Sequence, residues 1–188
     1  MSDFKQAFQK LIPEKRTKSE EEKVESYRGI RRLYYPRWAG WQIIDKSAGM
    51  NTENKLTMLE SCVKEFYKSN FWDQLGCDSI KSQSISESLF GLSINCGGII
   101  ANEYLKKAVD IINGNKCIAK EYPFEYKIDD SMLEMLNHGI QNKHDDILIK
   151  ILNGYQISFY LKLFEMNPAS RSCYDWFRKL HVVIPVSL

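Results

Sequence analysis

The sequence lacks several features that would place it in a familiar chemical class. Its five cysteines include no C-x-x-C pair and their number is odd, so neither a zinc site nor a complete set of disulfides is predicted. The three histidines do not have the spacing of zinc ligands. No G-x-x-x-x-G-K-S/T or G-x-G-x-x-G loop for phosphate and no G-x-S-x-G elbow is present. We therefore expect no metal and no cofactor.

Long apolar runs and a strong charge imbalance are also missing. No stretch approaches the roughly 18 consecutive apolar residues of a membrane span, and the N-terminus has no apolar segment of signal-peptide length. We expect synthesis in the cytoplasm without classical export. The net charge of +2 gives no general attraction to a polyanion. With 188 residues, of which 44% are hydrophobic and 27% charged, the chain is predicted to be an ordered globular protein with reduced, mostly buried thiols.

The most unusual stretch that is present runs from Gly29 to Asp45 and reads GIRRLYYPRWAGWQIID. Aromatic rings alternate here with arginines, and such a surface can stack on sugars or on bases while it holds anionic groups. Trp38 and Trp41 could instead be anchors of the core, because tryptophan buries a large area. Residue chemistry alone leaves three alternatives open: a core segment, a carbohydrate surface and a surface for single-stranded nucleic acid.

Apolar residues recur at three- and four-residue spacings along most of the remaining chain, which predicts helices. Asp3 is the expected cap of the first helix and Pro13 its end, while Asn51-Thr52 is expected to cap the second. A capping box of Ser84 and Glu87 opens a mostly apolar helix through 96 that should be the central buried one. The residues expected on the apolar faces of the first two helices are Phe4, Ala7, Phe8, Leu11 and Ile12, and then Leu56, Leu59, Val63, Phe66 and Asn70.

Further helices are predicted towards the C-terminus. Asn95 stands at the end of the central buried helix, where its amide would need partners. Gly114 is the expected C′ residue of the next helix, and Asp145 with Asp146 begins a long one. The apolar faces expected for these two helices comprise Ala101, Leu105, Ala108, Val109 and Ile112, and then Ile147, Ile151, Leu152, Tyr155, Phe159 and Leu163.

Several of these segments resemble a known family. The run of residues 27–30, followed by Pro36, Trp38, Gly40, Trp41 and the residues Ile43 to Asp45, resembles the "T-x-x-G-I-x-R … P-x-W-x-G-W-x-I-I-D" passage of phage-type N-acetylmuramidases. These are the lysozymes of glycoside hydrolase family 108, some of which are named "secretion activator protein". The likeness continues at 67–72, which resembles "Y-x-x-x-Y-W", and at 89–97, which resembles "F-D-F-A-V-N-S-G".

The resemblance implies a mainly α, lysozyme-like fold that forms a single compact unit with two portions. Residues 1–75 would be the muramidase-type portion and residues 84–188 the helical peptidoglycan-binding-type portion. The family's opening helix runs into a Glu-Gly-Gly motif whose glutamate is the catalytic acid. This nominates Glu14, although Lys15 and Arg16 follow it here.

The implied substrate is the glycan strand of peptidoglycan, and nucleic acid is not an expected partner. Tyr27, Arg28, Trp38 and Trp41 would line or support the cleft, and Gly29 and Ile30 would shape its turn. Further candidates are Trp72 and Asn95 for the substrate, and Glu20, Glu21, Glu22 and Glu25 for a second carboxylate. The enzyme would act at the cell wall after export or release. The alternative is a non-catalytic relative that binds peptidoglycan or a protein partner, such as a secretion-associated factor.

Overall fold

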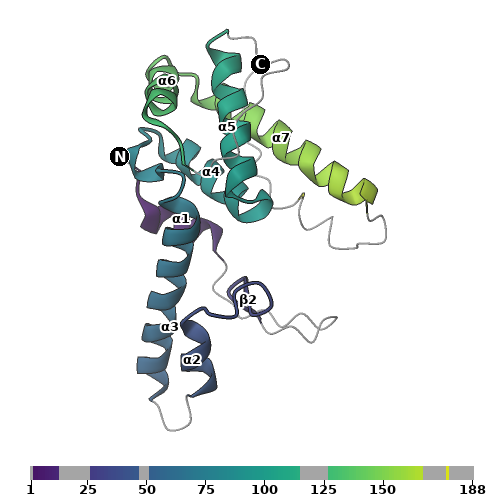
Figure 1. Cartoon of the computed structure of the whole chain (residues 1–188). Coiled ribbons are helices and arrows are strands. Elements are labelled where there is room, and N and C mark those ends of the chain that lie inside the picture. The colour runs from purple at the N-terminus through teal and green to yellow at the C-terminus, as the bar shows by residue number, and fades with distance from the viewer. Residues whose placement is uncertain (1, 13–25, 47–50, 115–126, 167–176, 178–188) are drawn as a thin grey trace. The chain divides into compact units, whose positions relative to one another are not determined.

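The computed structural model describes residues 2–12, 26–46, 51–114, 127–166 and 177 (Figure 1). Over these residues the secondary structure consists of helices and one two-stranded antiparallel sheet, which confirms the predicted mainly α class. The chain divides into two compact units, Phe4–Asn70 and Met1–Asp3 together with Phe71–Leu188. We call them the hairpin unit and the helical unit. The functional types expected for 1–75 and 84–188, and the packing of both portions as one body, stay predictions.

The hairpin unit combines short irregular elements with one long helix. It contains α1 (Phe4–Leu11), β1 (Ser26–Tyr27), β2 (Ile30–Arg31), α2 (Gly40–Asp45) and α3 (Thr52–Tyr67), which a π-helix (Lys68–Trp72) continues. The cap of α3 lies in the predicted pair Asn51-Thr52. It is Asn51, whose side chain accepts a hydrogen bond of 2.8 Å from the backbone N–H of Glu53. Leu59, Val63 and Phe66 on α3 are buried, whereas Leu56 is exposed. Figure 1 shows α2 alongside α3, against which it packs.

The helical unit is built around one central helix. Its elements are a 3-10 helix (Cys77–Ser79), α4 (Gln83–Cys96), α5 (Gly98–Ile112), α6 (Asp130–Gln141) and α7 (Asp145–Met166). Figure 1 shows α4, α5 and α7 together, and α4 packs against both of the others. The prediction that the segment 85–96 forms the central buried helix is therefore confirmed. Gly114 is the C′ residue after α5, with a φ of +68°.

The start of α4 differs from the predicted capping box. The helix begins at Gln83 with Ser82 as its N-cap, two residues earlier than expected, and no side chain caps it. Glu87 is consequently inside the helix, where it is buried and accepts a hydrogen bond of 3.0 Å from the Gln83 amide. The pattern Ser-x-x-Glu was misleading here because the helix already begins at Gln83, so Ser84 and Glu87 both lie inside it.

Two expectations about burial were wrong. Asn95 is exposed on α4, so its amide can be hydrated and needs no buried partner. On α7 the buried face differs from the predicted one, and only Leu152 belongs to both. Apolar residues occur on nearly every side of this helix, so their spacing fits more than one face. The residues actually buried on α7 are Leu148, Ile149, Leu152, Gln156 and Tyr160.

The cysteines that the structure describes carry free thiols, as predicted. Cys77 and Cys96 are buried, and Cys62 is partly exposed. Burial raises the pKa of Cys96 to about 12, and it raises the pKa of Cys62 and Cys77 as well. These thiols therefore remain protonated and unreactive near neutral pH.

Candidate functional site

A two-residue turn connects β1 and β2, and its second position requires glycine. Tyr27 pairs with Ile30 across β1 and β2, which leaves Arg28 and Gly29 as the central turn residues. Their φ angles are +47° and +84°, and positive values at both positions are the mark of a type I′ turn. A Cβ atom on Gly29 would lie 2.7 Å from the hydroxyl oxygen of Tyr67. Only glycine therefore fits the second turn position without a shift of its neighbours.

Tyr67 on α3 fastens this turn to the long helix. Its hydroxyl donates a hydrogen bond of 2.7 Å to the backbone carbonyl of Arg28. Burial raises the pKa of Tyr67 well above its ordinary value, so the phenol keeps the proton that it donates. The turn thus depends on a contact that spans 39 positions in the sequence.

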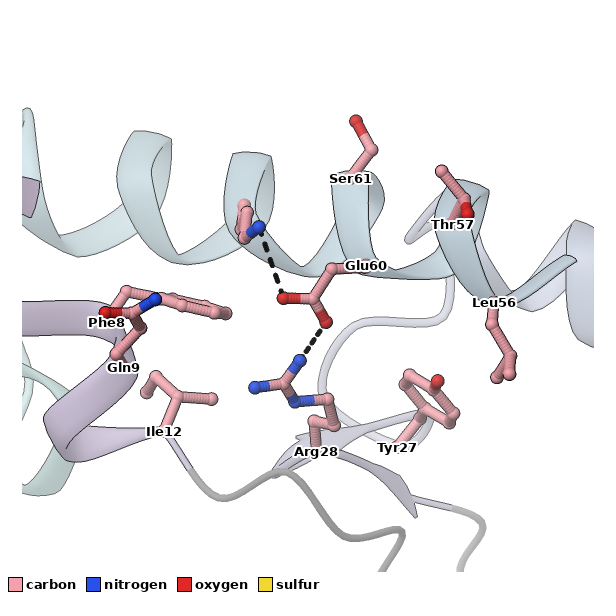
Figure 2. A pocket seen from close by; sticks show the side chains of 10 residues that line it. Phe8, Gln9, Ile12, Tyr27, Arg28, Leu56, Thr57, Glu60 and Ser61 are labelled. Atoms are coloured by element: carbon pink, nitrogen blue, oxygen red, sulfur yellow. Dashed lines mark hydrogen bonds and ion pairs between the residues drawn. The ribbon is translucent and has the colours of Figure 1, made fainter. Parts of the chain in front are cut away.

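The Arg28 side chain joins three elements. Its guanidinium lies 5.0 Å from the centre of the Phe8 ring on α1 and forms an ion pair with Oε2 of Glu60 on α3 (Figure 2). The other carboxylate oxygen of Glu60 lies 3.4 Å from Nζ of Lys64, one helical turn further along α3. A positive φ is uncommon for arginine and costs on the order of 1 kcal/mol. The buried cation–π contact and ion pair of Arg28 can offset that cost.

A pocket of about 690 Å³ lies beside this cluster, entirely within the hairpin unit. Figure 2 shows α3 along one side, with the residues of α1 and the hairpin residues Arg28 and Tyr27 across from it. Its volume is in the range of small-molecule sites. Among the lining residues, all of which the structure describes, Glu60 supplies the carboxylate. The lining consists of Phe8, Gln9, Ile12, Tyr27, Arg28, Leu56, Thr57, Glu60, Ser61 and Lys64.

The chemistry of this lining suits a sugar ring. Apolar side chains on the lining can cover the C–H faces of a pyranose. The hydroxyl of Ser61 and the Lys64 ammonium can donate to its oxygens. The hydroxyl of Thr57 donates to the carbonyl of Glu53 at 3.0 Å, so its oxygen can accept from the sugar. Glu60 is paired with two cations and keeps a side-chain exposure of 39%, so it can still accept hydrogen bonds from a ligand. Within the part of the chain that the structure describes, no group of side chains could hold a metal ion.

The two tryptophans of the unusual stretch lie beneath the surface. Trp38 and Trp41 are buried and meet edge to face, with ring centres 4.8 Å apart. The indole N–H of Trp38 donates to the carbonyl of Cys62 at 3.2 Å, and that of Trp41 donates to the carbonyl of Tyr35 at 2.7 Å. These contacts fit the alternative in which the tryptophans anchor the core. They can support a binding surface but do not form one themselves.

The other predicted site residues fall in different places. Tyr27 and Arg28 line the pocket, and Ile30 is fully buried beneath the turn. Trp72 belongs to the helical unit, where it has no exposed surface and its indole N–H donates to Asp78 at 2.7 Å. Asn95 is exposed in that same unit. The proposed acid Glu14, and the alternatives Glu20, Glu21, Glu22 and Glu25, lie outside the described residues.

Glu60 and its neighbours were not identified from the sequence. The i,i+4 spacing of Glu60 and Lys64 is a visible signal for a surface ion pair on a helix. It does not reveal the more informative partner, because Arg28 is 32 positions away and pairs with Glu60 only once α3 and the hairpin meet. The phenol of Tyr67 was missed for the same reason.

Comparison with known proteins identifies the class of one segment. Residues 19–97 match the family model described as Glycosyl hydrolase 108. This segment belongs to that family, which confirms the resemblance seen in the sequence. It includes the hairpin, α2, α3 and α4 but less than half of the chain, and it begins after Glu14. A search of curated proteins found no match. No helix in the described residues is long and apolar enough to cross a membrane.

Proposed function

We propose that this protein hydrolyses the glycan backbone of bacterial peptidoglycan, as an N-acetylmuramidase. The observation that carries the proposal is the match of residues 19–97 to a glycosyl hydrolase family. The pocket in the hairpin unit supports it, because apolar side chains, hydroxyl groups and a carboxylate converge there. The proposed place of action is the cell wall, which the protein would reach after export or release from the cytoplasm.

Glycoside hydrolysis needs a carboxylic acid that protonates the leaving oxygen. We assign this role to Glu14, which follows the pocket residue Ile12 by two positions in the sequence. Apolar neighbours would raise the pKa of such a carboxyl group and keep it protonated near neutral pH. Glu60 and Tyr27 would bind the hydroxyl and amide groups of the sugar. Trp38 and Trp41 would support the wall that carries Tyr27, since Tyr27 stacks on Trp38 with 5.9 Å between ring centres.

The test is the release of reducing ends from purified peptidoglycan. The wild type should release them, and Glu14→Gln should release them at a rate lower by a factor of about 100 or more, since general acid catalysis contributes about that much. Glu165→Gln, in an exposed position of α7, makes the same chemical change in the other unit and should keep the full rate. If Glu14→Gln kept the wild-type rate in a folded protein, Glu14 would not be the acid.

A non-catalytic relative is the second candidate, and a specific observation favours it. Lys15 and Arg16 stand where the related enzymes have two glycines, and the family match begins only at residue 19. Such a protein would bind peptidoglycan or a partner, for example as a secretion-associated factor. Binding to purified sacculi without release of reducing ends would support this candidate. Release of reducing ends by the wild type would exclude it.

A further inference from the structure

An exposed apolar loop lies between β2 and α2 in the hairpin unit. Leu33 and Tyr34 keep 65% and 63% of their surfaces exposed, and Tyr35 keeps 37%. Pro36 and Arg37 are exposed too, so five consecutive residues face outward. We call residues 33–37 the Leu-Tyr loop. Consecutive exposed apolar residues raise the cost of hydration and favour aggregation, so they are expected chiefly where a surface binds something.

Specific contacts hold the Leu-Tyr loop in this exposed form. The backbone N–H groups of Tyr34 and Tyr35 donate to the carbonyl of Arg31 at 3.1 and 2.9 Å. The carbonyl of Tyr35 accepts from the backbone of Trp38 at 3.1 Å and from the indole of Trp41 at 2.7 Å. The loop is therefore preorganised, and a ligand would not have to bear the entropy of ordering it.

A bidentate ion pair also supports the base of this loop. Arg32 binds both carboxylate oxygens of Asp45 at 2.7 and 3.0 Å, and its guanidinium lies 4.5 Å from the centre of the Trp41 ring. The hydrogen bond from Arg32 lowers the pKa of Asp45, so this carboxylate stays ionised and neutralises Arg32. The buried tryptophans and this ion pair thus support the Leu-Tyr loop from below and keep it exposed to solvent.

The charge around the loop indicates the kind of ligand. The guanidinium of Arg31 lies 5.1 Å from the centre of the Tyr34 ring, and Arg37 is exposed at the other end of the loop. An exposed aromatic ring and a leucine between two cations suit a polymer that has apolar sugar faces and carboxylates. Peptidoglycan has both, because its glycan strands carry peptides with free carboxylates.

We propose that the Leu-Tyr loop is a second peptidoglycan-binding surface, separate from the lining of the pocket. Leu33 and Tyr34 contact sugar faces there, and Arg31 and Arg37 contact carboxylates of the attached peptides. This inference rests on the proposed substrate, peptidoglycan, but does not need the hydrolytic step. In this proposal the Leu-Tyr loop binds the cell wall, and Trp38 and Trp41 support the loop.

The test is co-sedimentation with purified sacculi on ice. The variant carries Leu33→Ala, Tyr34→Ala and Arg37→Ala. A control in the same unit carries Met58→Ala and Lys46→Ala, which remove an exposed apolar side chain and an exposed cation outside both the loop and the pocket lining. The loop variant should bind sacculi at least about 10-fold more weakly than the wild type, and the control should bind like the wild type. Thermal unfolding of both variants should stay close to that of the wild type, because all five substituted side chains are exposed.

Other outcomes would overturn the inference. Sacculus binding by the loop variant at the wild-type level would exclude the loop as the binding surface. Wild-type protein that binds vesicles of an anionic phospholipid but not sacculi would assign the loop to a lipid surface instead. The same experiments distinguish failure of the proposed hydrolysis from failure of this inference. Sedimentation that depends on the loop, without release of reducing ends, would refute the proposed hydrolysis and support the binding surface. Reducing-end release together with normal sedimentation of the loop variant would refute the inference alone.

Discussion

Different kinds of contact stabilise the interior of each of the two units. In the helical unit, α4, α5 and α7 pack through apolar faces, and Leu89, Phe90 and Leu105 are fully buried. In the hairpin unit, single polar contacts fix an irregular backbone. The phenol of Tyr67 holds the turn, and the Arg28 side chain links α1 to α3. The candidate site lies in the unit whose backbone depends on such individual contacts.

This difference matters for function because the regular periodicity of a helix fixes which side chains lie on the same face. A turn fixed by specific side chains can instead place Tyr27 and Arg28 at a pocket and leave Leu33 and Tyr34 exposed nearby. Irregular structure of this kind is where binding residues are usually found. If the comparison is right, substitutions in the helical unit should destabilise it by leaving cavities in the core. Substitutions in the hairpin unit should destabilise it by removing the contacts that fix the turn.

The largest effect is expected in the core of the helical unit. Phe90→Ala should lower the free energy of unfolding by about 3 to 5 kcal/mol, because it leaves a cavity next to the edge-packed ring of Trp72. Chemical denaturation monitored by circular dichroism measures this change. Phe90→Leu conserves more of the volume and should cost markedly less. A loss below about 1 kcal/mol for Phe90→Ala would contradict a core held by packing.

An intermediate effect is expected at the turn of the hairpin unit. Gly29→Ala should cost about 2 kcal/mol, because alanine is strained at a φ of +84° and its Cβ would crowd the hydroxyl of Tyr67. Tyr67→Phe removes that oxygen but also the hydrogen bond to Arg28. A double-mutant cycle should therefore show that Gly29→Ala costs less in the Tyr67→Phe background. Strictly additive losses would mean that the phenol does not set the glycine requirement.

A smaller, pH-dependent effect is expected at the cap of α6. The Asp129 carboxylate accepts a hydrogen bond of 2.8 Å from the backbone N–H of Met132, and this bond lowers the pKa of Asp129. Asp129→Ala should cost about 1 kcal/mol at neutral pH. A lowered pKa in the folded state means that the stabilisation is present above the unfolded value near pH 4 and is lost as pH falls through the folded value.

The measurement for Asp129 is the difference in unfolding free energy between wild type and variant at several pH values. It should be constant from about pH 5 to 7 and should shrink below about pH 4. Asp129→Asn keeps a capping oxygen without a titrating charge, so its stability relative to Asp129→Ala should not change over this range. A difference that grew on acidification would have the wrong sign for this explanation.

The smallest effect is expected at Asn95, which the sequence had suggested as a buried amide. Because Asn95 is exposed on α4, Asn95→Ala should change the free energy of unfolding by no more than about 0.5 kcal/mol. The same denaturation experiment measures it. A loss of 2 kcal/mol or more would show that this amide is satisfied by protein partners after all, and would remove the contrast with Phe90 on the same helix.

The sequence predicted different amounts of the structure in the two units. The central helix, the Asn51 cap and the Gly114 terminus were recognisable because each depends on residues close together in the chain. The face of α7 was not, since apolar residues surround that helix. In the helical unit the errors therefore concern which side of a helix is buried and at which residue it begins.

In the hairpin unit the sequence identified the right stretch but not the roles of its residues. Composition could not decide whether Trp38 and Trp41 or the neighbouring Leu33 and Tyr34 face outward. That depends on two indole hydrogen bonds to carbonyls, of which one reaches Cys62 on α3. Glu60 was missed because its pairing with Arg28 is a long-range contact. The family match supports the class of the segment, which begins after Glu14.

The bond between Tyr67 and the Arg28 carbonyl also has a consequence for the order of folding. A hairpin with two residues in each strand has little stability alone, and its anchor emerges from the ribosome 39 residues later. At about 5 to 20 residues per second, the turn would wait roughly 2 to 8 seconds for its anchor during synthesis. We therefore expect the hairpin to form after α3, so that the N-terminal part of the sequence acquires its structure late.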